Sequence, residues 1–217
     1  MTVKHHLTDD LLMAYSTGDL PEAVNLIVAT HISLCDACRA ALESYEAVGG
    51  AVLDSCDSVG MSSDSLAAVL SMIQEQDNAV MERTAPRPKT DGVLPAPLCD
   101  YVAGGLENVK WRPVGMGVKQ AILRTSSEAT ARLLYIPAGT AIPDHGHRGL
   151  ELTLVLQGAF QDEDGYFARG DIEIANPDVN HTPVADISED CICLAVTDAP
   201  LKFKGLMPRI AQPFLGI

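Results

Sequence analysis

Apolar positions recur at helical spacing over the first 84 residues, and this pattern predicts four helices. The first helix is predicted between a cap at Thr8 and an end at Gly18, and the third between Ser33 and the Gly49-Gly50 stop. The second is predicted from Pro21 toward His31, and the fourth from Ser63 to about Arg83. Ser33 is expected as the N-cap of a third helix that begins at Leu34, because Asp36 follows it at capping-box spacing. The first part of the chain is therefore predicted to be a small helical bundle.

Beyond residue 98 the pattern changes to short runs typical of strands, namely 130–139, 150–158, 171–177 and 191–197. Prolines at positions 86, 88, 95 and 97 separate the two patterns and predict a stiff, extended linker. Closely spaced strands between Gly, Pro and Asp turns indicate an antiparallel sandwich or barrel. We therefore predict a helical domain over residues 1–84, a linker over 85–98 and a β domain over 99–217.

The fourth predicted helix carries an apolar stripe formed by Leu66, Val69, Leu70 and Ile73. Its opposite face holds acidic residues, so the helix is amphipathic. Such a stripe closes the core of its own domain or offers a surface to a partner helix. The pattern leaves both interpretations open.

Composition limits the classes of protein that the chain can represent. The chain is 47% apolar, which suffices for one or two ordinary cores, and no apolar run approaches the length of a membrane span. The first ten residues lack the apolar core of a secretory signal, so a cytoplasmic location without membrane contact is expected. In a reducing compartment the six cysteines are expected to be metal ligands, core residues or redox sensors.

The formal net charge of −14 is concentrated in the first part of the chain. Residues 1–84 hold three basic and thirteen acidic side chains, whereas the remainder holds twelve basic and sixteen acidic ones. Phosphates would repel this acidic half, so direct nucleic-acid binding is not expected. The charge would attract a basic protein partner, although a merely soluble acidic surface also accounts for it.

Three metal-binding side chains, His31, Cys35 and Cys38, stand at offsets of zero, four and seven residues. This spacing places them on one side of a helix or of a helix junction, and Zn²⁺ favours such a mixture of nitrogen and sulfur ligands. We expect His6 to be the fourth ligand, with His5 as the alternative. A redox Cys-x-x-Cys motif is the competing interpretation, but it would require a βαβ context that these helical flanks do not supply.

A second group of candidate ligands lies among the predicted strands: His145, His147, Glu151 and His181. His145 and His147 lie on one face of an extended segment, and Glu151 follows shortly after. Three imidazoles and a carboxylate suit zinc, iron, manganese and nickel. A second metal is therefore expected, but the ligand set does not identify it.

The spacing of these residues resembles the first motif of the cupin family, in which Gly139 and Gly158 flank the two histidines and Glu151. Gly170 and His181 fit the interval of the second cupin motif, although Asn176, Asp178 and Ala185 depart from its usual residues. The resemblance implies an antiparallel jelly-roll barrel with a metal bound inside it by the two His, the Glu and His181.

His6, His31, Cys35 and Cys38 in turn resemble the ligands of the zinc-binding anti-sigma domain, a helical bundle that wraps around an extracytoplasmic-function sigma factor. Such a domain joined to a cupin-like domain is similar to the ChrR group of bacterial transcriptional regulators. The resemblance implies zinc cofactors, a sigma-factor partner, and release of that partner under oxidative stress such as singlet oxygen. It also implies that the cupin domain acts in the signal response.

Two other functions compete with regulation. A cupin enzyme, such as a metal-dependent dioxygenase or isomerase, is the first alternative, but no acid/base pair stands out beyond the ligands. A bare metal-binding module is the second, and it leaves the acidity and the amphipathic helix unexplained. Cys191 and Cys193 alternate on one predicted strand and are expected to be either core residues or redox-active residues.

Overall fold

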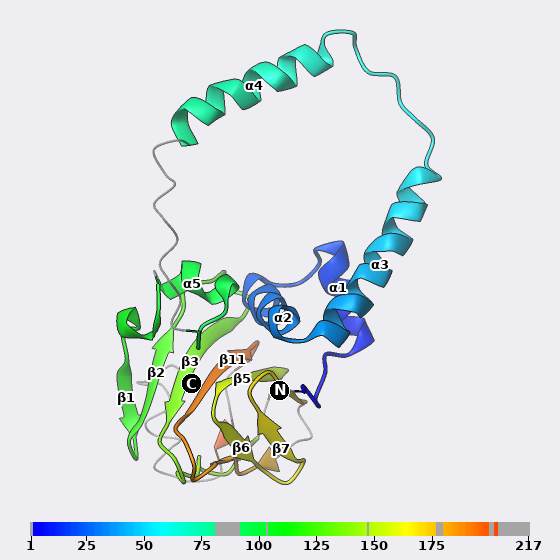
Figure 1. Cartoon of the computed structure of the whole chain (residues 1–217). Coiled ribbons are helices and arrows are strands. Elements are labelled where there is room, and N and C mark those ends of the chain that lie inside the picture. The colour runs from blue at the N-terminus through cyan, green and yellow to red at the C-terminus, as the bar shows by residue number, and fades with distance from the viewer. Residues whose placement is uncertain are drawn as a thin grey trace.

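The computed structural model describes residues 2–80, 92–102, 104–146, 148–176, 180–199 and 202–203. Its helices are α1 (Asp9–Thr17), α2 (Glu22–Leu34), α3 (Asp36–Asp54), α4 (Ser65–Val80) and α5 (Ala96–Val102), with a 3-10 turn at Leu106–Asn108. Figure 1 shows α1, α2 and α3 on one side of a β barrel, with α4 standing away from both.

The strands form one six-stranded antiparallel sheet and two three-stranded sheets. The large sheet has the order β1-β2-β3-β11-β5-β8, formed by Arg112–Gly115, Val118–Ile122, Thr130–Ile136, Cys191–Thr197, Glu151–Gln157 and Ile172–Ala175. The sheet β10-β6-β7 contains Val184–Ala185, Ala159–Gln161 and Tyr166–Ala168, and the sheet β12-β4-β9 contains Lys202–Phe203, His145–Gly146 and Asn180–His181. The prediction of N-terminal helices followed by an antiparallel β barrel is confirmed.

Local sequence signals explain where the first helices begin and end. Thr8 caps α1 by accepting a hydrogen bond from the Leu11 backbone N–H, and Gly18 ends the helix at a φ of 74°. The predicted N-cap at Ser33 is wrong, because Ser33 lies in the last turn of α2 and its hydroxyl donates to the Thr30 carbonyl. Cys35 caps α3 instead, since its sulfur accepts a hydrogen bond from the Cys38 backbone N–H.

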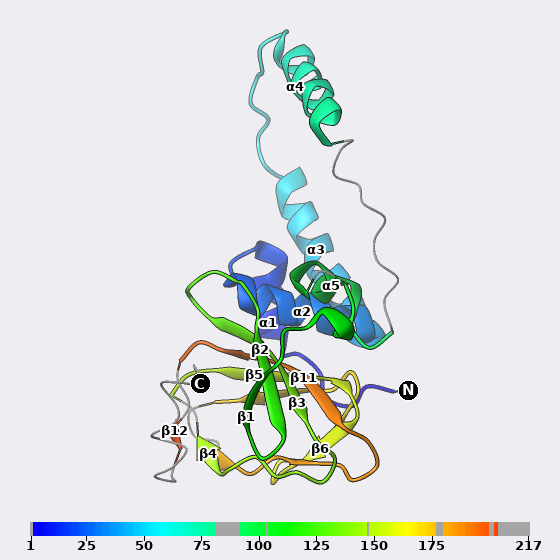
Figure 2. The same cartoon turned by 90° about the vertical axis from the view of Figure 1, so that its left-hand side faces the viewer.

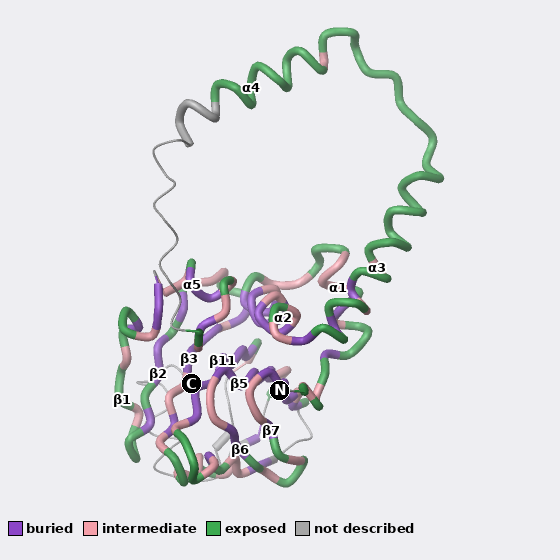
Figure 3. The backbone as a smooth tube through the Cα atoms, in the orientation of Figure 1, coloured by how far each residue is buried: buried purple, intermediate pink, exposed green. Residues whose placement is uncertain are grey.

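The predicted end of the third helix at Gly49-Gly50 is also wrong, since α3 continues to Asp54. A glycine lowers helix propensity by about 1 kcal/mol, but it keeps the backbone N–H that a proline would remove. The ladder of hydrogen bonds can therefore continue through both glycines. Figure 3 shows that this end of α3 and nearly all of α4 up to residue 75 are exposed, whereas α2 is mostly buried.

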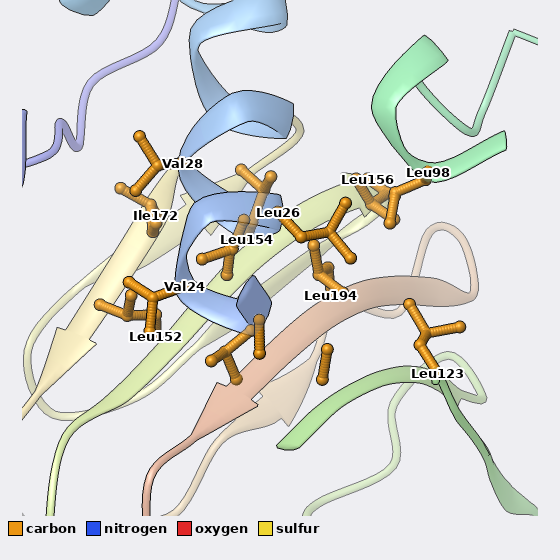
Figure 4. Close-up of a cluster of buried hydrophobic side chains, with 14 of the residues drawn as sticks. Val24, Leu26, Val28, Leu98, Leu123, Leu152, Leu154, Leu156, Ile172 and Leu194 are labelled. Carbon is orange, nitrogen blue, oxygen red and sulfur yellow. The ribbon is translucent and has the colours of Figure 1, made fainter. Parts of the chain in front are cut away.

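Helix α2 packs on the outer face of the six-stranded sheet (Figure 4), which explains why it is apolar almost all round. The side chains in this layer come from both parts of the chain: Val24, Leu26, Val28, Leu152, Leu154, Leu156, Ile172 and Leu194. A fully buried Leu or Val contributes about 1.5–3 kcal/mol to folding. The helices and the barrel therefore share one hydrophobic core, which the sequence did not predict.

A second core lies inside the barrel, between the large sheet and β10-β6-β7. It contains Val118, Ile136, Val155, Phe160, Phe167, Ala185, Cys191 and Cys193. Strands β5 and β11 are consequently buried on both faces, with alternate residues in the two cores. This double burial explains why their sequences are nearly continuous in apolar residues.

The end of the predicted linker differs from an extended segment. Leu94 and Leu98 are buried, and α5 begins at Ala96 and contacts α2. Tyr101 on α5 donates a hydrogen bond to Glu22, and the backbone N–H of Ser126 donates to the same carboxylate at 2.6 Å. Figure 2 shows α5 beside α2, above the barrel. Residues 85–91 of the predicted linker lie outside the described residues.

Candidate metal centres and partner surface

The junction between α2 and α3 brings four metal-binding side chains together, although they come from distant positions in the sequence. His31 lies in the last turn of α2, Cys35 lies between the helices, and Cys38 lies in the first turn of α3. His6 reaches them from the segment that precedes α1. One donor atom of each residue lies within 4.8 Å of all the others.

The distances within this cluster fit a tetrahedral zinc site. The Cys35 sulfur lies 3.3 Å from Nδ1 of His6, and the Cys38 sulfur lies 3.2 Å from Nε2 of His31. Nδ1 of His6 also lies 3.6 Å from the Cys38 sulfur. Zinc bonds of about 2.3 Å to sulfur and 2.0–2.1 Å to nitrogen place these two ligand atoms about 3.5 Å apart in a tetrahedron. The cluster therefore has the spacing and the donor set to hold a metal ion.

The electrostatics of the cluster agree with this role. Burial and the nearby His6 lower the pKa of His31 to about 4, so its imidazole is neutral at pH 7 and can donate an electron pair. Burial raises the pKa of the Cys38 thiol to about 11, with Cys35 acting in the same direction. A buried thiolate pair therefore needs a cation beside it, and a bound metal supplies that charge.

His5, the alternative fourth ligand, does not join this cluster. Its ring lies against that of Phe167 on β7, with the ring centres 4.3 Å apart. Its carbonyl accepts a hydrogen bond from the backbone N–H of Ile172 at 3.3 Å. His6 therefore lies among the ligands from the helices, whereas His5 lies against the barrel.

The structure places a second polar cluster in the barrel around His181 on β9. Nδ1 of His181 lies 2.8 Å from the Asp162 carboxylate and 2.9 Å from the Glu173 carboxylate. Burial alone would lower the pKa of His181, but hydrogen bonding to Glu173 and its negative charge raise this pKa to about 9. Burial raises the pKa of Glu173 to about 7, against the opposing effect of His181. Two carboxylates thus hold the Nδ1 proton, which makes Nε2 the nitrogen suited to bind a metal.

The other predicted cupin ligands stand in the following places. The backbone of His145 on β4 pairs with that of His181 on β9. Glu151 is buried at the start of β5, and its charge raises the pKa of His181. His147 and the side chain of His145 lie outside the described residues. The described part of the chain therefore brings Glu151 toward His181 and leaves the full set of four as a prediction.

Asp162 and Glu173 were not predicted from the sequence. Glu173 alternates with Ile172 and Ile174 in a strand, and this pattern could have indicated a carboxylate on an inner face. Asp162 belongs to a turn, where its second function is to accept hydrogen bonds from the backbone N–H groups of Asp164 and Gly165. A turn aspartate gives no such signal, because turns commonly contain aspartate for this local purpose.

Cys191 and Cys193 are buried in the inner core of the barrel, with their sulfurs 3.4 Å apart. The hydrogen bond with Cys191, together with burial, raises the pKa of Cys193 well above its ordinary value. Both features favour the thiol over the reactive thiolate. The predicted shared face is therefore present, and its surroundings are those of core residues.

The predicted partner stripe on α4 is exposed. The exposed fractions are 70% for Leu66, 50% for Val69, 49% for Leu70 and 50% for Ile73. Both views show α4 away from the barrel and from the other helices (Figures 1 and 2). The stripe therefore lies outside the cores described above. None of the described helices is long and apolar enough to cross a membrane.

Comparison with known proteins agrees with both parts of this description. The family model of the ChrR cupin-like domain matches residues 102–201. Over all 217 residues the chain is 55% identical to the anti-sigma-E factor ChrR of Cereibacter sphaeroides, and the match covers 100% of both chains.

Among solved structures, the chain is similar to one in the crystal structure of Rhodobacter sphaeroides SigE in complex with the anti-sigma ChrR. The identity is 54%, the TM-score is 0.77, and the match covers 90% of this chain and 99% of that one. An RmlC-like cupin protein of Ralstonia eutropha matches 46% of this chain and 70% of its own at 21% identity, with a TM-score of 0.41. The full-length identity and the matching domain order show that the chain belongs to the ChrR family of anti-sigma factors.

Proposed function

We propose that this chain binds and inhibits an extracytoplasmic-function sigma factor in the cytoplasm and releases it under oxidative stress such as singlet oxygen. The observation that carries the proposal is the exposed apolar stripe of α4 in a chain that resembles a named anti-sigma factor over its full length. An exposed amphipathic helix supplies apolar anchors to a partner. The related ChrR chain was crystallised in complex with SigE, which supports a sigma factor as that partner.

Charge defines how the partner would be recognised. Sigma factors bind DNA and therefore present basic surfaces, whereas residues 1–84 carry thirteen acidic and three basic side chains. This charge would accelerate association at low salt. Leu66, Val69, Leu70 and Ile73 would then hold the complex through contacts that salt hardly weakens.

We propose zinc as the metal of His6, His31, Cys35 and Cys38, because it favours tetrahedral sites with two sulfur and two nitrogen ligands. The four ligands come from three different segments, so the metal would join α2, α3 and the segment before α1. Structural zinc contributes about 10–16 kcal/mol of apparent binding free energy to such domains. Its function would be to fix the helices that lead to the partner surface.

We propose that the barrel holds a second metal at His145, His147, Glu151 and His181 and takes part in the response to the signal. The Nδ1 hydrogen bonds of His181 to Asp162 and Glu173 support this, because metal-binding histidines commonly donate their other ring N–H to a carboxylate. When bound, the metal would offer an oxidant or ligand a place to act. The similarity to a named anti-sigma factor favours this regulatory function over catalysis by a cupin enzyme.

The proposed division of labour assigns inhibition to residues 1–84 and signal response to residues 99–217, with residues 85–98 between them. A fragment of residues 1–84 would contain the four N-terminal ligands and the α4 stripe. It would also expose Val24, Leu26 and Val28, which pack on the barrel in the full chain. We therefore expect the fragment to inhibit the sigma factor but to be less stable than the full chain.

The test of the proposed function is copurification of the full chain with the sigma factor encoded in its native cell, followed by transcription with purified polymerase. We expect a complex of one chain with one sigma factor and loss of transcription from promoters of that sigma factor. Leu66→Glu serves as the variant with a disturbed stripe. Unchanged transcription at a saturating amount of the full chain would contradict the proposal.

A further inference from the structure

The side chain of Asp171, at the entrance to β8 in the barrel, binds the segment that carries His6. Its Oδ1 accepts hydrogen bonds from the backbone N–H groups of Lys4 at 2.6 Å and His5 at 2.9 Å. Its Oδ2 accepts another from the backbone N–H of Ala168 at 2.9 Å. Asp171 is only 2% exposed, and a buried carboxylate is stable when backbone N–H groups surround it in this way.

Two further contacts hold the same segment against the barrel. The carbonyl of His5 accepts a hydrogen bond from the backbone N–H of Ile172, and the His5 ring lies against that of Phe167. His6 follows directly, and its Nδ1 is one of the four donor atoms of the N-terminal metal cluster. The barrel therefore determines where one ligand of the helical domain lies.

Gly170, next to Asp171, lies against the two segments that carry the imidazole ligands. Gly170 has a φ of 91°, and an added Cβ would lie 2.9 Å from Val3 and 3.9 Å from Leu34. The backbone at residues 170 and 171 thus packs against the segment before α1, which carries His6, and the end of α2, which carries His31.

The strand that begins at this point leads directly to the second cluster. Glu173 stands two residues after Asp171, and its carboxylate lies 2.9 Å from Nδ1 of His181. A strand advances about 3.3 Å per residue, so these two acidic residues are separated by less than about 7 Å of backbone. Asp171 and Glu173 are thus joined by one short piece of strand, along which a shift of the backbone at Glu173 would reach Asp171 and the segment that it holds.

We propose that Asp171 is a positioning residue for the N-terminal metal cluster, through which a change at His181 alters how firmly that cluster holds its metal. This inference rests on the proposed function insofar as both clusters bind metals. It adds that the barrel supplies outer contacts to the zinc cluster, so the two sites form one connected unit. Substitution of residues that hold metal ligands in place commonly changes metal affinity by about 10–100-fold.

The test measures metal release from the full chain after its N-terminal cluster is loaded with Co²⁺. Absorption by thiolate-to-cobalt charge transfer reports only metal bound by cysteine sulfur, so its decay in excess chelator gives the release rate. For Asp171→Asn, which keeps the size but removes the charge, we expect release about tenfold faster than from the parent chain. Glu173 contacts His181 but none of the four N-terminal ligands. Glu173→Gln is also expected to release cobalt faster than the parent chain.

Two variants serve as controls. Asp190→Asn removes another carboxylate that accepts a backbone hydrogen bond, from Ala138 at 2.9 Å, and its partners Ala138 and Tyr135 belong to neither cluster. Glu22→Gln weakens a different connection between the helices and the barrel, through Tyr101 and Ser126. Both are expected to release cobalt at the parent rate, and acceleration by Glu22→Gln equal to that of Asp171→Asn would overturn the specific role of Asp171.

Release from folded Asp171→Asn at the parent rate would also overturn the inference. If Asp171→Asn does not fold, Gly170→Ala takes its place, because the added methyl group disturbs the same backbone without changing any charge. Cobalt release from Gly170→Ala at the parent rate would then overturn the inference. Transcription inhibition by the parent chain is measured on the same preparation. If the parent chain inhibits transcription and Asp171→Asn releases cobalt at the parent rate, this inference alone is rejected. If the parent chain does not inhibit transcription, the proposed function is rejected.

Discussion

Nδ1 of His6 lies 3.3 Å from the sulfur of Cys35, although 29 residues separate them in the sequence. The distance matches the spacing of about 3.5 Å between nitrogen and sulfur ligands of one tetrahedral zinc ion. The approach requires the segment before α1 to return alongside the junction of α2 and α3. The metal cluster is therefore a tertiary arrangement, and its loss should affect the helices and not only the site.

Cys35→Ser and Cys38→Ser are each expected to lose the N-terminal zinc and to loosen α1, α2 and α3, because the metal joins their segments. We expect one zinc fewer per chain by elemental analysis, lower helix content by circular dichroism, and no stable complex with the sigma factor. Cys56→Ser changes an exposed cysteine outside the cluster and is the control. A Cys38→Ser chain that lacks the zinc but binds its partner as tightly as the parent would show that the site is dispensable.

The two adjacent histidines should behave differently. His6→Ala removes a donor atom and is expected to lower the zinc content of the cluster strongly, whereas His5→Ala removes a ring contact with Phe167 and keeps the backbone hydrogen bonds that hold the same segment. Competition with a zinc indicator dye distinguishes the two variants, and we expect weakening of at least about tenfold for His6→Ala and a much smaller weakening for His5→Ala. Equal losses in both variants would mean that the fourth ligand is not His6.

The stripe of α4 should control how long the complex lasts. Leu66→Glu and Ile73→Glu are expected to raise the dissociation rate by about tenfold or more, because each places a charge in an apolar contact, while association changes little. Ser71→Glu adds the same charge to another face of the helix and is the control. All three variants should unfold at the parent temperature, since these side chains are exposed. Surface plasmon resonance that finds parent dissociation rates for both stripe variants would place the stripe outside the interface.

The His181 cluster predicts how the stability of the metal-free chain depends on pH. The pKa of His181 is raised from 6.5 to about 9, so its contribution to stability is complete below pH 6.5 and is lost as the pH rises through 9. The pKa of His31 is lowered to about 4 and that of Glu173 is raised to about 7, so both groups titrate at or below about pH 7. The pKa of Cys38 is raised from 9 to about 11, so this thiol titrates above pH 9. The fluorescence of the single tryptophan, Trp111, which lies near Tyr135 on the barrel, reports on unfolding of that domain.

In excess chelator we expect the unfolding temperature of the barrel to fall between about pH 7 and pH 9, the interval over which His181 loses its proton. Glu173→Gln should flatten this dependence, because it removes the principal partner that raises the pKa of His181. A parent curve that is level or rises over this interval would contradict the hydrogen-bonded arrangement of the cluster.

The sequence predicted those features that depend on spacing within one segment. The intervals between His31, Cys35 and Cys38, and those within the cupin motifs, indicated metal-binding groups, and periodicity located α4 and the main strands. Capping was predicted correctly at Thr8 and wrongly at Ser33, where the competing cap was a cysteine in a metal cluster. A thiol is an unusual cap, so residue preferences alone favoured the serine.

Features that depend on contact between distant segments could not be predicted. Helix α2 has apolar residues on several faces, which indicates that it is buried but does not identify the element that it packs against. The structure shows that it packs against the outer leucines of β5 and β11. Asp162 and Asp171 look like ordinary loop acids in the sequence, and the alternation of Glu173 with two isoleucines indicates an inner face but names no partner. Their functions follow only from the backbone N–H groups and the imidazole that the fold brings to them.

Whether one chain both inhibits a sigma factor and senses stress through its barrel is tested most directly by a reporter driven by the cognate sigma factor. The reporter is measured with and without singlet oxygen in cells that carry different full-length chains. We expect the parent chain to repress the reporter and release it under stress, His181→Ala to repress but respond weakly, and Leu66→Glu to repress poorly under both conditions. Induction of the His181→Ala strain to the level of the parent would contradict sensing by the barrel, and a reporter that the parent chain does not repress would contradict the anti-sigma function itself.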